Sequence, residues 1–307
     1  MQQAATTTAD LPKIRTHRER AWNTFIRNRT ALVGLVMVIV IVLIAIFADD
    51  WIVATIQGRE PVPLLAPYDP NIQDTRNRLQ PPSAEHWMGT DTYGRDVFSR
   101  IIYGSRVSLM VGIFAVLMGG LIGTALGLMA GYSRSSIENT IMRIVDVFMA
   151  FPSLIMGLMV LAVLGSGLDK MIIAIGIMLA PGFVRLVHGA TLGIRENDYV
   201  LAARALGVSQ SRILRLHILP NLSGEVVVMG SIWIAVAIRV EASLSFIGLG
   251  VSPPTPAWGT MIRDGVQYLT TAPWLSLFPG IAILLTVLAF NLLGDGLRDV
   301  LDSKSYD

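Results

Sequence analysis

The sequence has no cysteine among its 307 residues, and only 15% of its residues are charged. The absence of cysteine excludes thiol catalysis and leaves the redox compartment undetermined. Because a soluble domain carries about 25% charged residues, the low charge content favours an integral membrane protein, as does the mean hydropathy of +0.59. The formal net charge of +2 is too small to suggest a nucleic-acid-binding protein.

Motifs for nucleotide binding and catalysis are also missing. The chain has no G-x-x-x-x-G-K-[ST] loop, so we do not expect it to bind or hydrolyse ATP by that mechanism. It has no H-E-x-x-H, no G-x-S-x-G and no Cys/His cluster, and its four histidines are scattered. We therefore expect a non-catalytic membrane protein without catalytic, cofactor-binding or metal-binding residues.

Six apolar segments are long enough to cross a bilayer, which requires about 20 residues. They cover residues 31–48, 107–131, 141–164, 171–190, 224–248 and 277–297. The sequence thus predicts an all-α integral membrane protein. It divides into a tail (1–30), a first transmembrane helix (31–48), an extracytoplasmic segment (49–106), a five-helix core (107–298) with a cytoplasmic loop at 195–222, and a second tail (299–307).

The orientation follows from the distribution of positive charge. The N-terminal tail carries six basic residues against Asp10 and Glu19, namely Lys13, Arg15, Arg18, Arg20, Arg27 and Arg29. The positive-inside rule places this tail in the cytoplasm, and six crossings return the C-terminus to the same side. The first apolar segment is longer than a signal-peptide core and lacks a good cleavage site, so we expect an uncleaved anchor.

Two features are expected on the outer side. Residues 97–106 place apolar side chains at helical spacing between charged ones, which predicts an amphipathic helix on the outer membrane surface before the second span. The last outer loop, 249–276, contains Pro253, Pro254 and Pro256. We expect this loop to form a stiff rim rather than a mobile lid.

Small residues and prolines mark the predicted spans. A glycine recurs every four residues along one face of the second span, which allows another backbone to approach closely, at Gly119, Gly123, Gly127 and Gly131. Pro152 and Pro181 are expected to kink the third and fourth spans. Such helices suit a bundle that changes shape, although static bundles also contain them.

Ionisable residues within spans are costly and often functional. The chain places six of them within or near predicted spans, at Asp146, Arg185, His188, Arg239, Glu241 and Asp295. Each also has a structural explanation. Asp146 and Asp295 lie near predicted inner ends, and Arg185 could snorkel or pair with a neighbouring segment. Nothing resembles the chain of carboxylates expected of a proton-driven carrier.

One polar stretch, residues 199–221, separates two apolar segments. Ala202, Ala203, Arg204, Ala205 and Leu206 favour a helix. The stretch continues with a turn at Gly207, which tolerates positive φ, then a helix capped by Ser209 that contains Arg212 and Arg215 and is stopped by Pro220. It predicts a helix-turn-helix that docks into a groove on a soluble partner.

The same stretch resembles the cytoplasmic coupling loop of ABC-transporter permeases, with Leu201-Ala202-Ala203, Gly207 and Ile218-Leu219-Pro220 in the positions of that signature. Leu201 departs from it, because the family usually has glutamate there. Further motifs resemble the C-type, second permease subunit of the dipeptide/oligopeptide/nickel family, from about Asn28 onward: HWMGTDTYGRDVFSRIIYGSR, FPSLIMGL, EASLSFIGLG, PPTPAWG and NLLGDGLRD.

The resemblance implies a type I importer-like permease with six transmembrane helices in the bacterial cytoplasmic (inner) membrane. It further implies a homologous B-type permease subunit as partner, one or two ABC ATPase subunits that bind ATP and Mg, and an extracytoplasmic solute-binding protein. The expected ATPase-docking surface is Ala202, Ala203, Ala205, Leu206 and Gly207, with Arg204, Arg212 and Arg215 as peripheral electrostatic contacts.

The cargo and two other functions stay open. Family frequency favours di- or oligopeptides, then glutathione, with a nickel complex as the alternative. An ion-coupled secondary transporter would need a coupling-ion site in this chain and no ATPase. A membrane scaffold would have no pathway and no cargo-dependent ATPase activity.

Overall fold

The computed structural model describes residues 25–58, 61–133 and 135–302. Tail residues Lys13, Arg15, Arg18 and Arg20, which underlie the predicted orientation, lie outside this part of the chain. Helices dominate the described residues: α2 (Arg29–Ile46), α3 (Trp51–Gln57), the 3₁₀ helix η1 (Thr75–Asn77), α4 (Val97–Tyr132), α5 (Ser135–Met149), α6 (Ser153–Leu164), α7 (Leu168–Arg195), α8 (Asp198–Ala205), α9 (Gln210–Ile213), the π-helix η2 (Leu214–Ile218), α10 (Leu219–Ile247), α11 (Trp258–Val266) and α12 (Trp274–Asp302).

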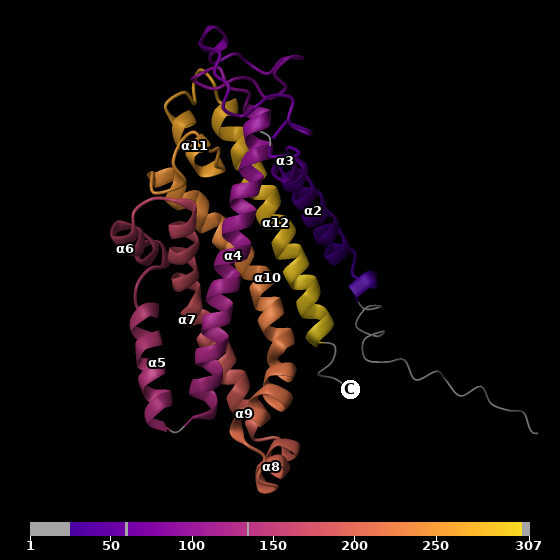
Figure 1. The fold of residues 1–307 in the computed structure, drawn as a ribbon, viewed down its shortest axis with the longest axis vertical. Helices are drawn as coiled ribbons and strands as arrows, with labels where there is room; N and C mark the ends of the chain where they lie inside the picture. The colour runs from indigo at the N-terminus through magenta and orange to yellow at the C-terminus, as the bar shows by residue number, and fades with distance from the viewer. Residues whose placement is uncertain (1–24, 59–60, 134, 303–307) are drawn as a thin grey trace, which may run out of the picture.

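The long helices form an elongated bundle. Helices α4, α7, α10 and α12 run along its long axis, with α2 against α12 and α5 beside α7 (Figure 1). Helices α8 and α9 lie at one end, while α11 and the segment before α4 lie at the other (Figure 1). A region of short helices and turns therefore lies at one end of the apolar bundle, and a loop-rich region lies at the other (Figure 1).

Within the described residues, five helices are long and apolar enough to cross a membrane: α2, α4, α7, the run from α9 through α10, and α12. A sixth candidate span is the pair α5 and α6, which is bent by 95°. The bend lies at Pro152, which has no N–H to donate and disfavours helical geometry at Phe151. In contrast, α7 continues through Pro181 as one helix.

Helix α4 differs from its predicted form. The expected surface helix at 97–106 is wrong, because those residues are the first turns of α4, which is 36 residues long. Arg100 is buried, and its Nη1 donates a hydrogen bond to the carbonyl of Pro70 at 2.8 Å. Loop residues, rather than lipid headgroups, therefore cover the polar face of this segment.

The end of the bundle around α11 is tied together by two tryptophans. The indole Nε1 of the buried Trp258 donates to the carbonyl of Ile101 at 3.0 Å. Trp274 Nε1 donates to the carbonyl of Thr90 at 3.3 Å. These bonds join α11 to the first turns of α4 and the start of α12 to the segment that precedes α4. Distant parts of the sequence thus form one cap, here called the rim (α11, the start of α12 and the segment before α4).

The four regularly spaced glycines of α4 all face α7. A Cβ at Gly119 would lie 2.6 Å from the carbonyl oxygen of Gly176, and one at Gly127 would lie 2.8 Å from that of Val184. At Gly123 and Gly131 an added Cβ would meet the side chains of Phe183 and Thr191. Any side chain at these positions would push the two helices apart.

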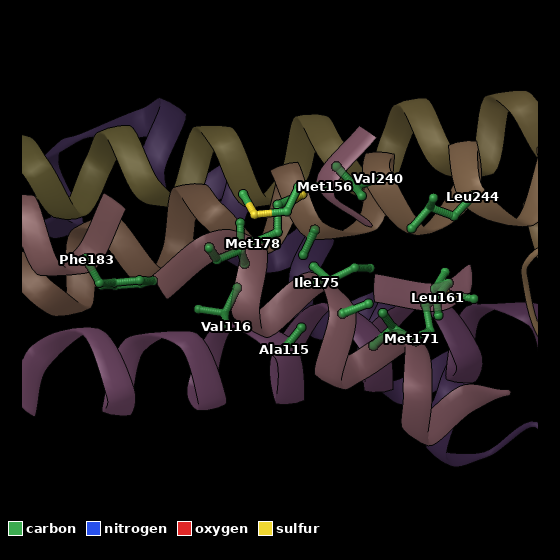
Figure 2. Close-up of a cluster of buried hydrophobic side chains, with 14 residues drawn as sticks. Ala115, Val116, Met156, Leu161, Met171, Ile175, Met178, Phe183, Val240 and Leu244 are labelled. Atoms are coloured by element: carbon green, nitrogen blue, oxygen red, sulfur yellow. The ribbon is translucent and has the colours of Figure 1, made fainter. Parts of the chain in front are cut away.

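The largest apolar core lies beside this contact. It gathers side chains from α4, α6, α7 and α10, including Ala115, Leu161, Met171, Ile175 and Leu244 (Figure 2). The core holds the second half of the bent pair, α6, against α7 and α10, whereas most apolar side chains of α5 remain exposed.

Candidate functional site

The polar stretch forms a compact projection at one end of the bundle, here called the elbow (residues 198–218: α8, the turn, α9 and η2). Gly207 has a φ of +77°, in the left-handed region that favours glycine. Among the described residues, no heavy atom lies within 4 Å of a Cβ added there. The backbone conformation of the turn, and not crowding within this chain, therefore requires glycine.

The inner side of the elbow is packed onto the bundle. Val200, Ile213 and Ile218 join Val187 of α7 and Leu222 of α10 in one buried apolar cluster. Ala203 belongs to the same cluster and is only 9% exposed. The expectation that Ala203 forms part of an exposed docking surface is therefore wrong, because the amphipathic α8 turns this residue towards its own chain.

The outer side of the elbow is partly apolar and exposed. Leu206 is 84% exposed, and Ala202, Ala205 and Gly207 are also exposed. Leu201, which replaces the glutamate of the coupling-loop signature, is exposed as well. The inner residues therefore fix the elbow to the bundle, and its outer face presents small and apolar side chains.

The three arginines of the elbow differ in their contacts. The guanidinium of Arg204 lies over the ring of Tyr132, 5.3 Å from its centroid, so it packs on the end of α4. Arg212 and Arg215 are exposed on α9 and η2. Arg195, before the elbow, donates from Nη1 to the carbonyl of Gly131 at 2.8 Å and joins the end of α7 to that of α4.

Pro220 does not end a helix, contrary to the sequence-based prediction. It occupies the first turn of α10, where proline is tolerated, and the π-helix η2 immediately precedes it. The wider π turn removes the clash that the proline ring would make with the carbonyl four residues earlier, so the chain stays helical from Gln210 to Ile247.

Asn221 reinforces this junction and was missed in the sequence. Its Nδ2 donates to the carbonyl of His217 at 2.6 Å and to the Oη of Tyr199 at 3.2 Å. The second bond joins the start of α10 to α8. An Asn directly after a helix-start proline was the available signal, but its partner 22 residues away could not be seen without the fold.

Two polar arrangements lie within the apolar helices. Glu241 of α10 is completely buried, and it accepts hydrogen bonds from Ser108 Oγ at 2.9 Å and Ser245 Oγ at 2.8 Å. Arg185 of α7 pairs with Asp146 of α5 through Nη2 and Oδ1 at 2.6 Å. One arrangement is sealed inside the bundle, whereas the other is open.

A second pair joins the same two helices. His188 Nε2 lies 2.9 Å from Glu138 Oε1 and is more covered than the first pair. Within the described residues, no group of three or more His, Cys, Asp or Glu side chains is placed to hold a metal ion.

Residues 123–305 match the family model for the binding-protein-dependent transport system inner membrane component. The chain belongs to this family. Residues 18–82 also match the N-terminal TM domain of oligopeptide transport permease C. The matched regions include the elbow, the bent pair and Glu241, and they confirm the resemblance to the C-type permeases.

Two curated relatives extend over most of the chain. The dipeptide transport system permease protein DppC of Alkalihalophilus pseudofirmus is 45% identical and aligns with 91% of this chain and 87% of its own length. The glutathione transport system permease protein GsiD of Pectobacterium atrosepticum is 43% identical, with 95% and 92% covered.

A solved structure of the MetNI methionine ABC transporter in an inward-facing conformation supports the fold. It matches with a TM-score of 0.55 and 20% identity, over 66% of this chain and 97% of that one. The family match and the curated relatives, rather than this structure, show that the chain is a permease subunit of a binding-protein-dependent ABC importer and a multi-pass protein of the bacterial inner membrane.

Proposed function

We propose that this permease imports di- or oligopeptides, or a small peptide such as glutathione, as the C-type half of a heterodimeric pathway. The two curated relatives, named for dipeptide and glutathione transport, support this cargo class. Their similar identities leave the two peptide cargoes equally favoured. A homologous B-type permease supplies the other half of the pathway.

The elbow is the contact through which ATP hydrolysis drives this chain. The observation that carries this assignment is the pairing of an exposed, small and apolar outer face with an inner face anchored to α7 and α10. ATPase subunits that bind ATP and Mg dock on Ala202, Ala205, Leu206 and Gly207, with Arg212 and Arg215 at the edge. The elbow and both chain termini then lie in the cytoplasm.

The rim at the opposite end receives the solute-binding protein. Trp258 joins α11 to the start of α4, and Trp274 joins the start of α12 to the segment before α4, so a protein that docks there meets one surface. A push on the elbow reaches α7 and α10 directly through the shared apolar cluster. These two helices extend from the elbow end through the bundle core, and motion of their elbow ends therefore rearranges the core.

The test is uptake in proteoliposomes that contain both permeases and the ATPase subunits. We expect import of a labelled dipeptide or of glutathione that requires ATP and the solute-binding protein. Import without ATP hydrolysis would contradict the mechanism and favour an ion-coupled carrier. Import of a nickel complex, with neither peptide carried, would contradict the proposed cargo.

A further inference from the structure

The ion pair between Asp146 and Arg185 joins two apolar helices, α5 and α7, and both of its side chains are exposed. The two side chains remain 59% and 51% exposed although their charged atoms are only 2.6 Å apart. Arg185 lies ten residues before the end of α7 at Arg195, about 15 Å along the helix, and about 25 Å from its start. Asp146 lies about 16 Å beyond the start of α5.

The depth of the pair differs from the sequence-based expectation. The sequence placed Asp146 near the inner end of a span, where headgroups could satisfy it. Because α5 begins at Ser135, Asp146 instead lies deep within the bent candidate span, close to its break. A bilayer core is about 30 Å thick, and both charges lie about 15 Å from the elbow-side ends of α5 and α7, away from the ends of the bundle.

Such a pair is more stable beside water than beside lipid. Charged side chains at membrane depth are costly, and they face a bundle interior or a water-filled cavity. The face of α7 that carries Arg185 continues one and two turns later with Gly189 and Gly193, both exposed. Among the described residues, no heavy atom lies within 4 Å of a Cβ added at either glycine. The pair therefore borders open space along a face with little side-chain bulk.

Two other polar arrangements within the helices, Glu241 and the pair of His188 with Glu138, lack this openness. Glu241 is sealed by Ser108 and Ser245 and has no exposed surface. His188 and Glu138 continue the polar strip between α5 and α7 but are more covered. Arg239 of α10 is also exposed, but only Asp146 and Arg185 combine open side chains with a close pair of opposite charges among the ion pairs described between the apolar helices.

Their chemistry matches a zwitterion. A guanidinium presents a planar fork of donors that binds a carboxylate in two-point fashion, and an aspartate accepts hydrogen bonds from an ammonium group. When no solute is present, the two side chains neutralise each other. A free peptide carries both complementary charges and can exchange partners with the pair without introducing net charge into the membrane.

We propose that Asp146 and Arg185 form a transient binding site for the charged ends of a peptide in the translocation pathway, with Arg185 contacting the carboxylate and Asp146 the ammonium group. This inference rests on the proposed peptide cargo. It adds a charge-selective contact within the membrane to the selection already made by the solute-binding protein.

The first test asks whether this face is in water. The chain has no native cysteine, so Gly189→Cys introduces its sole thiol next to the ion pair and leaves the pair intact. In the assembled transporter, we expect a membrane-impermeant thiol reagent to label this cysteine during turnover, and a transported peptide to slow the labelling. Val36→Cys, on an exposed apolar face of α2, is the lipid-facing control and should remain unlabelled. A Gly189→Cys protein that resists labelling in every nucleotide state would overturn the proposal.

The second test uses cargo with blocked ends. Wild type, Arg185→Gln and Asp146→Asn are compared for import of a free dipeptide, its C-terminal amide and its N-acetyl form, each at a concentration that saturates the binding protein. Relative to wild type, we expect Arg185→Gln to lower import of the free dipeptide about tenfold, as for a lost charged hydrogen bond, and import of the amide much less. By the same reasoning, Asp146→Asn should lower import of the free dipeptide and should lower import of the N-acetyl form much less.

A purely structural role for the pair makes a different prediction. If the pair only holds α5 against α7, each variant should lose the same fraction of import with all three cargoes, and that result would overturn the inference while leaving the peptide function intact. Arg143→Gln removes an equal charge one turn away on α5 and should show no cargo dependence. ATPase activity stimulated by the binding protein reports that each variant is assembled. A wild-type complex that imports none of these peptides would overturn the proposed cargo and this inference together.

Discussion

At the scale of the residue, Gly207 shows a requirement that comes from backbone conformation alone. Its φ of +77° lies in the left-handed region, where every residue other than glycine is strained and asparagine is strained less than most. Among the described residues, nothing crowds an added Cβ. The effect of a substitution therefore reports on the shape of the turn and on the docking partner, not on packing within this chain.

We predict that Gly207→Val uncouples ATP hydrolysis from uptake while insertion and subunit pairing persist. Strain of about 1–3 kcal/mol for a β-branched residue at positive φ would distort the turn between α8 and α9. Uptake and ATPase activity are measured in the same vesicles, with Gly207→Asn as the control that adopts the left-handed conformation more easily. Normal uptake by Gly207→Val would remove this role.

Glu241 gives a second prediction at this scale. Glu241→Ala would leave the hydroxyls of Ser108 and Ser245 without their acceptor in a buried site, which costs about 1–3 kcal/mol. We expect a lower unfolding temperature of the detergent-solubilised complex. Glu241→Gln keeps an acceptor oxygen and should be destabilised less. Equal stability of the alanine variant and wild type would show that the hydrogen bonds do not hold α4 against α10.

At the scale of the element, the contact between α4 and α7 depends on which glycine faces the partner backbone. A Cβ at Gly123 would lie 2.7 Å from the carbonyl oxygen of Ala180, whereas one at Gly120 would make ordinary contact with the Phe183 ring at 3.5 Å. The two positions are three residues apart on the same helix. They differ mainly in the atoms that an added Cβ would contact, which include backbone atoms at Gly123 and are those of an aromatic ring at Gly120.

We therefore predict that Gly123→Ala destabilises the permease by about 1–3 kcal/mol, the usual effect of overpacking, and that Gly120→Ala changes stability much less. Thermal unfolding in detergent measures both. If the two variants proved equally stable, the close approach of α4 and α7 would not be a determinant of the fold.

Helix existence was readable from the sequence, but helix ends were not. Long apolar runs marked α2, α7, α10 and α12, since burial in lipid imposes helices wherever the backbone lacks water. The start of α4 was misjudged because its polar face is covered by Pro70 and its loop, a contact across 30 residues. Pro220 was misread as a stop because a π turn can precede a proline and absorb it.

The candidate site was predictable to a similar extent. Local rules placed the two short helices of the elbow and the glycine turn between them. They could not show that Ala203 points inwards, because that depends on how α8 rests against Val187 and Leu222. The pairing of Asp146 with Arg185 likewise depends on α5 lying beside α7.

At the scale of the whole molecule, the bundle joins two specialised ends. At one end the elbow packs against α7 and α10, and at the other end Trp258 joins the rim to the start of α4. Between them lie the tight contact of α4 with α7 and the open face that carries Arg185. In the proposed mechanism, force applied at the elbow changes the shape of the pathway between the two ends.

The most direct test of this account is the rate of ATP-driven peptide uptake by a transporter with Leu206→Asp. Leu206 is 84% exposed, so the change leaves the fold of this chain intact while placing a charge at the centre of the proposed ATPase contact. We predict that uptake falls at least about tenfold, the expected effect of a lost apolar anchor at an interface. Uptake at the wild-type rate would contradict the claim that the elbow transmits the work of ATP hydrolysis.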